Sequence, residues 1–106
     1  MNTTTLRILL AISEEGCTAA EIIARLASIP GGGKIPSLPA LYRHLKAGID
    51  HGWLQVEPMD DGTPGRPRQI YRLTSPGKKA IAHESRKLRA LATFALGEVE
   101  DPGVAR

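Results

Sequence analysis

The feature that most constrains this chain is a change in the spacing of its apolar residues near residue 53. In residues 53–57 and again in residues 69–73, apolar and polar side chains alternate, as they do in a β-strand with one buried face. The connection over residues 58–68 is dense in Pro, Gly and Asp. The two segments therefore predict an antiparallel hairpin with a long polar tip. We expect its inward-facing side chains to be Leu54, Val56, Tyr71 and Leu73.

Two stretches near the N-terminus have helical spacing instead. The first covers residues 4–13, with Thr3 or Thr4 as its cap and Gly16 as its stop. The second begins at Thr18, where Thr-Ala-Ala-Glu is a capping-box sequence, and is ended by the Pro-Gly-Gly-Gly run of residues 30–33. Its apolar stripe consists of Ile22, Leu26 and Ile29.

A third helix opens at Ser37 and closes at Gly52, with Pro39 in its first turn. Gly48 interrupts it, which indicates either close packing or a local bend, because glycine is a poor helix former. The apolar face of this helix consists of Leu38, Leu41, Leu45 and Ile49.

A last helix follows the hairpin, capped by Thr74 or Ser75, and runs to about residue 96 before a polar tail. Three helices, a hairpin and a helix in this order predict a winged helix-turn-helix, an α+β fold that is mostly helical. We expect a winged-helix domain over residues 1–75, a C-terminal helix over 76–96 and a tail over 97–106.

Composition excludes several classes of protein. The 106 residues suit one domain, contain no apolar run long enough to span a membrane, and show no export signal at the N-terminus. A single cysteine, Cys17, excludes an internal disulfide and favours the cytoplasm. We expect no cofactor or metal, because the three histidines are poorly spaced for ligation, and neither a nucleophile–base pair nor a phosphate-binding loop is present.

Positive charge gathers in the middle of the chain. Residues 34–79 carry eight basic and four acidic side chains, while the segments on either side are close to balance. A local basic excess favours an anionic partner.

Three stretches resemble the PadR-like family of bacterial transcriptional regulators. The third helix carries Ser-Leu-Pro-Ala-Leu-Tyr at residues 37–42, and the hairpin carries Gly-Arg-Pro-Arg at 65–68. Tyr-Arg-Leu-Thr at 71–74 followed by Gly77 then matches the family pattern that opens the last helix. The resemblance covers about residues 6–80 and implies double-stranded DNA as a partner, with a role in transcription regulation, as a repressor that occludes a promoter.

In this fold the third helix enters the major groove, and the hairpin tip suits the minor groove. Tyr42 resembles the family tyrosine, whose hydroxyl can bond a phosphate; partial burial is the alternative. Arg72 is expected at phosphates, if it touches DNA at all. The predicted DNA-binding set is Thr18, Ser37, Leu38, Pro39, Ala40, Tyr42, Arg43, Lys46, Arg66, Arg68 and Arg72.

The last helix has more apolar surface than one small body covers, in a stripe near heptad spacing. The family resemblance implies that its partner is the same helix of a second subunit. A homodimer of this kind suits a pseudo-palindromic operator. The predicted dimerisation residues are Ile81, Leu88, Leu91, Phe94 and Ala95.

Some alternatives remain open from the sequence. The hairpin or the apolar last helix can instead serve a winged-helix protein-interaction module without specific DNA binding. Trp53 either plugs the core or stacks an aromatic effector, which leaves a small-molecule effector as a possible but unidentified partner. Cys17 is either a buried thiol or an oxidant sensor.

Overall fold

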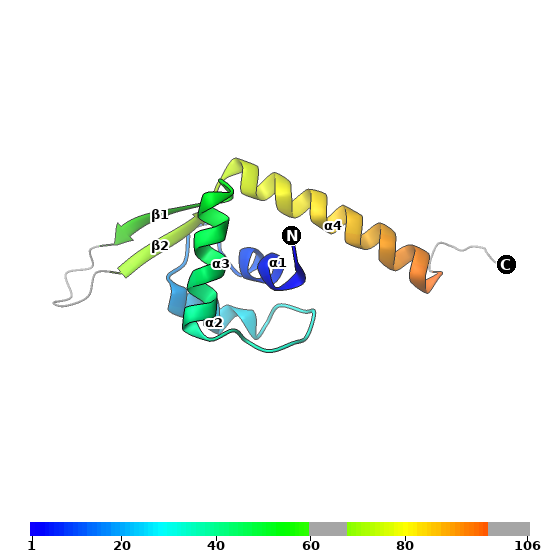
Figure 1. Cartoon of the computed structure of the whole chain (residues 1–106), viewed down its shortest axis with the longest axis horizontal. Coiled ribbons are helices and arrows are strands. Elements are labelled where there is room, and N and C mark those ends of the chain that lie inside the picture. Colours follow the sequence, from blue (N-terminus) through cyan, green and yellow to red (C-terminus); the bar gives the residue numbers. More distant parts are fainter. Residues whose placement is uncertain (60–67, 98–106) are drawn as a thin grey trace.

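The computed structural model describes residues 1–59 and 68–97. A three-helix body carries a two-stranded hairpin on one side and a long last helix on the other (Figure 1). The predicted winged helix-turn-helix is confirmed. The elements are α1 (Thr3–Leu10), α2 (Ala19–Leu26), α3 (Leu38–Asp50), β1 (Leu54–Met59), β2 (Arg68–Leu73) and α4 (Ser75–Leu96).

Polar side chains cap all four described helices. Thr18 forms the predicted capping box with Glu21, and Ser37 and Thr74 each accept a bond from a backbone amide three residues on. At α1 the prediction is wrong, because Asn2 rather than Thr3 or Thr4 is the cap. Both threonines instead lie inside the first turn.

Helices α1 and α2 are also shorter than predicted. Helix α1 ends at Leu10, because Ala11 already serves as its C-terminal cap. Helix α2 ends at Leu26, and Ile29 lies beyond it, partly buried against the core. The apolar period therefore continued past both helix ends, into turns that still bury their side chains.

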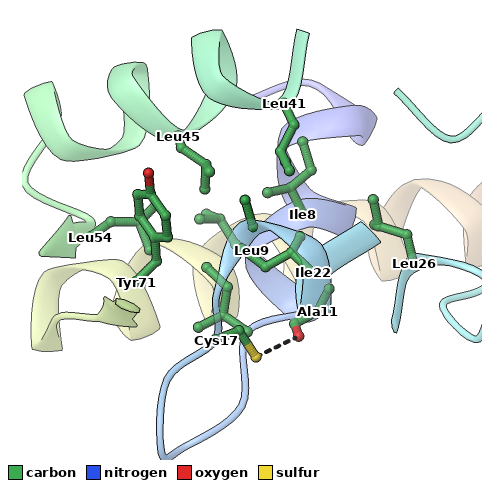
Figure 2. Packing of buried hydrophobic residues seen from close by; sticks show 12 residues of the cluster. Ile8, Leu9, Ala11, Cys17, Ile22, Leu26, Leu41, Leu45, Leu54 and Tyr71 are labelled. Carbon is green, nitrogen blue, oxygen red and sulfur yellow. Dashed lines mark hydrogen bonds between the residues drawn. The ribbon is translucent and has the colours of Figure 1, made fainter. Parts of the chain in front are cut away.

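The core forms where α1, α2 and α3 meet the base of the hairpin (Figure 2). Leu54 of β1 and Tyr71 of β2 close it on the hairpin side. Gly48 reflects close packing, because a Cβ there would lie 2.9 Å from the Cδ1 atom of Leu54. The largest fully buried side chains are Ile8, Leu9, Ile22, Leu26, Leu41 and Leu45.

The hairpin is antiparallel, with Leu54 opposite Leu73 at its base and Met59 opposite Arg68 at its outer described end. Cys17 adds a single bridge beside Tyr71, through backbone bonds of 3.0 and 2.8 Å. Val56 is exposed rather than inward-facing, although Tyr71 opposite it is buried, because β2 is the strand that pairs with Cys17 of the body and β1 is the outer strand.

A buried arginine fastens α1 to the end of α2. The guanidinium of Arg7 donates to the carbonyl oxygens of Leu26 and Ile29, both at 3.1 Å, and to that of Pro30 at 3.3 Å. Leu26 is the last residue of α2, and its carbonyl also accepts the Ile29 amide, so the cation complements the negative end of this helix. Arg7 thereby fixes the start of the connection that leads to α3.

Helix α4 leaves the body soon after its first turns. Gly77 is buried against the backbone of Trp53, and Ile81 is partly buried against the core. Glu84 is held 3.7 Å from the N-terminal ammonium of Met1 and 3.3 Å from the Lys87 ammonium. Beyond Glu84 the helix extends away from α1 (Figure 1). None of the helices in the described ranges has the length and apolarity needed to cross a bilayer.

Candidate nucleic-acid interface

The outward face of α3 is set by what the helix buries on its other side. Leu41, Leu45 and Gly48 recur at helical spacing and pack into the core. Tyr42 and Arg43 consequently point away from the body, and Tyr42 is 49% exposed. The solvent-facing residues of the helix include Leu38, Pro39, Tyr42, Arg43 and Lys46.

Two cations lie on this face of α3. Arg43 makes no hydrogen bond or ion pair within residues 1–59 and 68–97. Lys46 lies 3.5 Å from the carboxylate of Asp50, an exposed i,i+4 pair of the kind that contributes little stability. Both head groups are therefore accessible to an anionic partner.

The base of the hairpin adjoins this helix face. Burial raises the pKa of Tyr71, and the nearby Tyr42 adds a smaller increase in the same direction. Helix α3 also contacts β1, the strand that follows it in the chain. The accessible surface of Tyr42 shows that its side chain is exposed rather than packed away, as the phosphate-binding alternative requires.

Arg68 lies at the start of β2 and is exposed. Hydrogen bonds from Thr18 lower the pKa of Glu21 at the start of α2, and the positive charge of Arg68 lowers it further by a smaller amount. Strand β2 and helix α2 contact each other. Arg66, the other predicted wing arginine, lies outside the described residues.

Thr18 is already engaged by its own helix. Its amide donates to the carboxylate of Glu21 at 2.8 Å, and its hydroxyl accepts from the Glu21 amide at 3.2 Å. A phosphate at this helix start would have to displace a carboxylate from the amide. The DNA contact of Thr18 stays a prediction.

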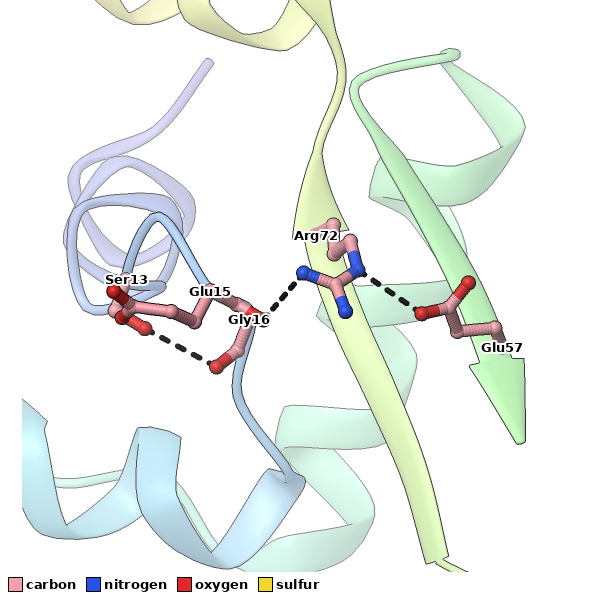
Figure 3. A network of polar contacts seen from close by, with 5 residues as sticks. All are labelled: Ser13, Glu15, Gly16, Glu57 and Arg72. Carbon is pink, nitrogen blue, oxygen red and sulfur yellow. Dashed lines mark hydrogen bonds and ion pairs between the residues drawn. The ribbon is translucent and has the colours of Figure 1, made fainter. Parts of the chain in front are cut away.

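Arg72 also has internal partners (Figure 3). Its Nε atom lies 3.0 Å from the Glu57 carboxylate on the neighbouring strand, and its Nη1 atom donates to the carbonyl of Glu15. Gly16 allows this approach, since a Cβ there would lie 2.6 Å from the Ile70 Cγ2 atom. Arg72 fastens the hairpin to the α1–α2 connection, which argues against its predicted phosphate contact.

Ser37 and Leu38 open α3 in different ways. The hydroxyl of Ser37 accepts from the Ala40 amide at 3.3 Å, so its predicted DNA contact has to share that oxygen with the cap. Leu38 continues the apolar series of Leu41 and Leu45, but the core does not bury it. Leu38 is 51% exposed, because the first turn of α3 extends past the core. Ala40 is partly buried.

The remaining candidates form no second site. Trp53 packs against the core and stacks on His51 with 4.4 Å between ring centroids, as expected of a core plug. Cys17 is a buried free thiol near the carbonyl of Ala11. In the part of the chain that the structure describes, no group of three or more His, Cys, Asp or Glu side chains is placed to hold a metal ion.

The predicted dimerisation residues divide into two groups. Ile81 is partly buried within its own subunit. Further along α4, Leu91 is 60% and Phe94 89% exposed. Leu88 and Ala95 are exposed on the same half of the helix.

Comparison with solved structures shows where this fold has been seen before. A PadR-like transcription factor from Bacteroides fragilis is 24% identical, with a TM-score of 0.73 over 90% of this chain and 88% of that one. A PadR family transcription regulator from Clostridium difficile is 15% identical, with a TM-score of 0.76 over 93% of this chain and 100% of that one.

A third structure is a conserved protein of unknown function described as a potential transcriptional factor. It is 28% identical, with a TM-score of 0.73 over 92% of this chain and 88% of that one. No family model and no curated protein matches the sequence. The resemblance to PadR-family structures that the motifs indicated is therefore confirmed at the level of the fold.

Proposed function

We propose that this chain is a homodimeric, sequence-specific DNA-binding regulator of transcription, of the PadR-like type. The observation that carries the proposal is the outward face of α3, where Arg43 and Lys46 are accessible beside the base of the hairpin. The likeness to solved PadR-family regulators supports the same function. A protein that acts on chromosomal promoters would work in the cytoplasm.

The proposed contacts follow from this geometry. Helix α3 enters the major groove, where an arginine can make two hydrogen bonds to guanine. Arg43 is the base-reading candidate, because its guanidinium has no internal partner in the described part of the chain. Tyr42, Lys46 and Arg68 hold the phosphates on either side, and the outer part of the wing, including Arg66, follows the minor groove.

The proposed dimer presents two α3 helices at once. Leu88, Leu91 and Ala95 repeat at spacings of three and four on α4, and Phe94 widens this stripe. A second copy of the same helix matches such a stripe by two-fold symmetry. The two α3 helices would then read half-sites about 34 Å apart, or a multiple of that. Occupying a promoter in this way would repress it.

The proposal is tested by selecting bound duplexes from a random pool and measuring their affinity against salt concentration. If the dimer neutralises roughly 6–10 phosphates, affinity should fall about 10³–10⁵-fold between roughly 50 and 200 mM salt. The double variant Arg43→Ala with Lys46→Ala should bind roughly 10- to 100-fold more weakly and with a shallower salt slope.

A matched control makes the same change in net charge on another element, α4. Arg86→Ala with Arg89→Ala removes two positive charges from the outer half of α4 and should leave affinity within about twofold. Equal losses in both double variants would show that only net charge matters. Failure to select any duplex at low salt would refute the proposed function and favour a protein-interaction module.

A further inference from the structure

The first turn of α3 presents apolar side chains to solvent at the place where a groove-binding helix reads bases. Leu38 is 51% exposed, the preceding Ile35 is exposed, and Pro39 follows directly. Exposed leucines are common on protein surfaces, so exposure alone assigns no role. Leu38 is of interest because it lies at the N-terminal end of α3, and the N-terminal residues of a groove-binding helix contact the base edges.

This turn has one polar side chain, that of Ser37. Ser37 uses its hydroxyl oxygen to cap the helix. Pro39 has no amide hydrogen, and Ala40 ends at its Cβ. The nearest hydrogen-bonding groups, Tyr42 and Arg43, lie one turn further along. Apart from the Ser37 hydroxyl, the side chains of the first turn can therefore read bases only through apolar contact.

The major-groove edges of the bases offer one apolar group, the C5-methyl of thymine. We propose that Leu38, flanked by Pro39, determines specificity by packing on a thymine methyl in each half-site. This inference rests on the proposed function and deepens it by naming one kind of base that the site requires. The cations at Arg43, Lys46 and Arg68 favour a nucleic acid over an apolar protein surface as the occupant of this face.

Deoxyuridine provides a direct test, because it differs from thymidine only by that methyl group. The full-length protein is used with a duplex selected from a random pool, and each thymine is replaced by deoxyuridine one position at a time. We expect affinity to fall about fourfold at one or two positions in each half-site, which is the effect of one buried methyl group. At the other thymines affinity should not change.

A variant and a matched control connect the effect to the residue. Leu38→Ala should bind the parent duplex more weakly and should lose its sensitivity to deoxyuridine at those same positions. Leu10→Ala removes a similarly exposed leucine, 42% accessible and located on α1, and should keep the full sensitivity. Thermal melting of both variants shows whether they fold. If Leu38→Ala does not fold, the deoxyuridine scan on the unsubstituted protein still tests whether a thymine methyl is read.

The outcomes separate this inference from the proposed function. If the protein binds selected duplexes but tolerates deoxyuridine at every position, Leu38 reads no methyl group and the proposed function stands. If Leu38→Ala retains the sensitivity, another residue reads the methyl and the inference is also overturned. If no duplex is bound, the proposed function fails and this inference fails with it.

Discussion

Replacing Gly77 with alanine is expected to destabilise the fold by at least about 3 kcal/mol, the upper range for overpacking. The first turn of α4 crosses directly over the turn between α3 and β1. A Cβ at position 77 would lie 2.9 Å from the carbonyl carbon of Trp53 and closer still to its oxygen. Because that oxygen also accepts the Thr74 amide at 2.9 Å, the obstacle is fixed backbone that cannot move aside alone.

The measurement is urea unfolding followed by circular dichroism, with Gly48→Ala as the matched control. Gly48 is also helical and buried, but its new Cβ would meet the end of the Leu54 side chain, which can shift. Alanine is the better helix former by up to about 1 kcal/mol, so Gly48→Ala should remain within about 1 kcal/mol of the parent. Equal stability of the Gly77→Ala variant and the parent would contradict the packing described for α4.

The double variant Leu91→Glu with Phe94→Glu is expected to convert the proposed dimer into a folded monomer. The two side chains are more exposed than Leu88, so charge there should leave the subunit fold intact while opposing the helix–helix contact. A single subunit can hold only one half-site. Its affinity for the two-half-site duplex should fall about 10²–10⁴-fold through loss of the linked second contact.

Analytical ultracentrifugation gives the oligomeric state of this variant, and duplex titration gives its affinity. Arg86→Ala with Arg89→Ala makes the same change in net charge beside Phe94, with which both arginines line a surface pocket, but it places no carboxylate on the apolar stripe and should stay dimeric. A parent protein that is monomeric at all concentrations would contradict the dimer. So would a charged variant that sediments as a dimer.

The fold was predictable because local rules governed most of it. Three helix caps were predicted correctly because each directly precedes a stretch with helical apolar spacing, namely Thr18, Ser37 and Thr74. The change of period at residue 53 predicted the hairpin. The predicted helix cap was wrong where two neighbouring residues are equally good caps, as at Asn2 and Thr3. The predicted helix end was wrong where the apolar period continues past the helix, as at Ile29.

The candidate site was less predictable, because exposure depends on where the body ends. Leu38 fits the apolar period of Leu41 and Leu45, yet it lies beyond the core and is exposed. The contacts of Arg7 and Arg72 join carbonyl oxygens 19 and 57 residues away in the chain, which no local pattern reveals. Arg43 lies outside the buried series of Leu41 and Leu45 and is exposed, and its DNA contact stays a prediction.

The most direct test of the account is to map the surface that touches duplex DNA, by two-dimensional NMR of the ¹⁵N-labelled protein during titration. We predict the largest shift changes in α3 from Leu38 to Lys46 and at Arg68, with little change in α1. Changes confined to α1 or to the outer half of α4, with α3 unaffected, would contradict the claim that α3 and the base of the hairpin form one DNA-binding face.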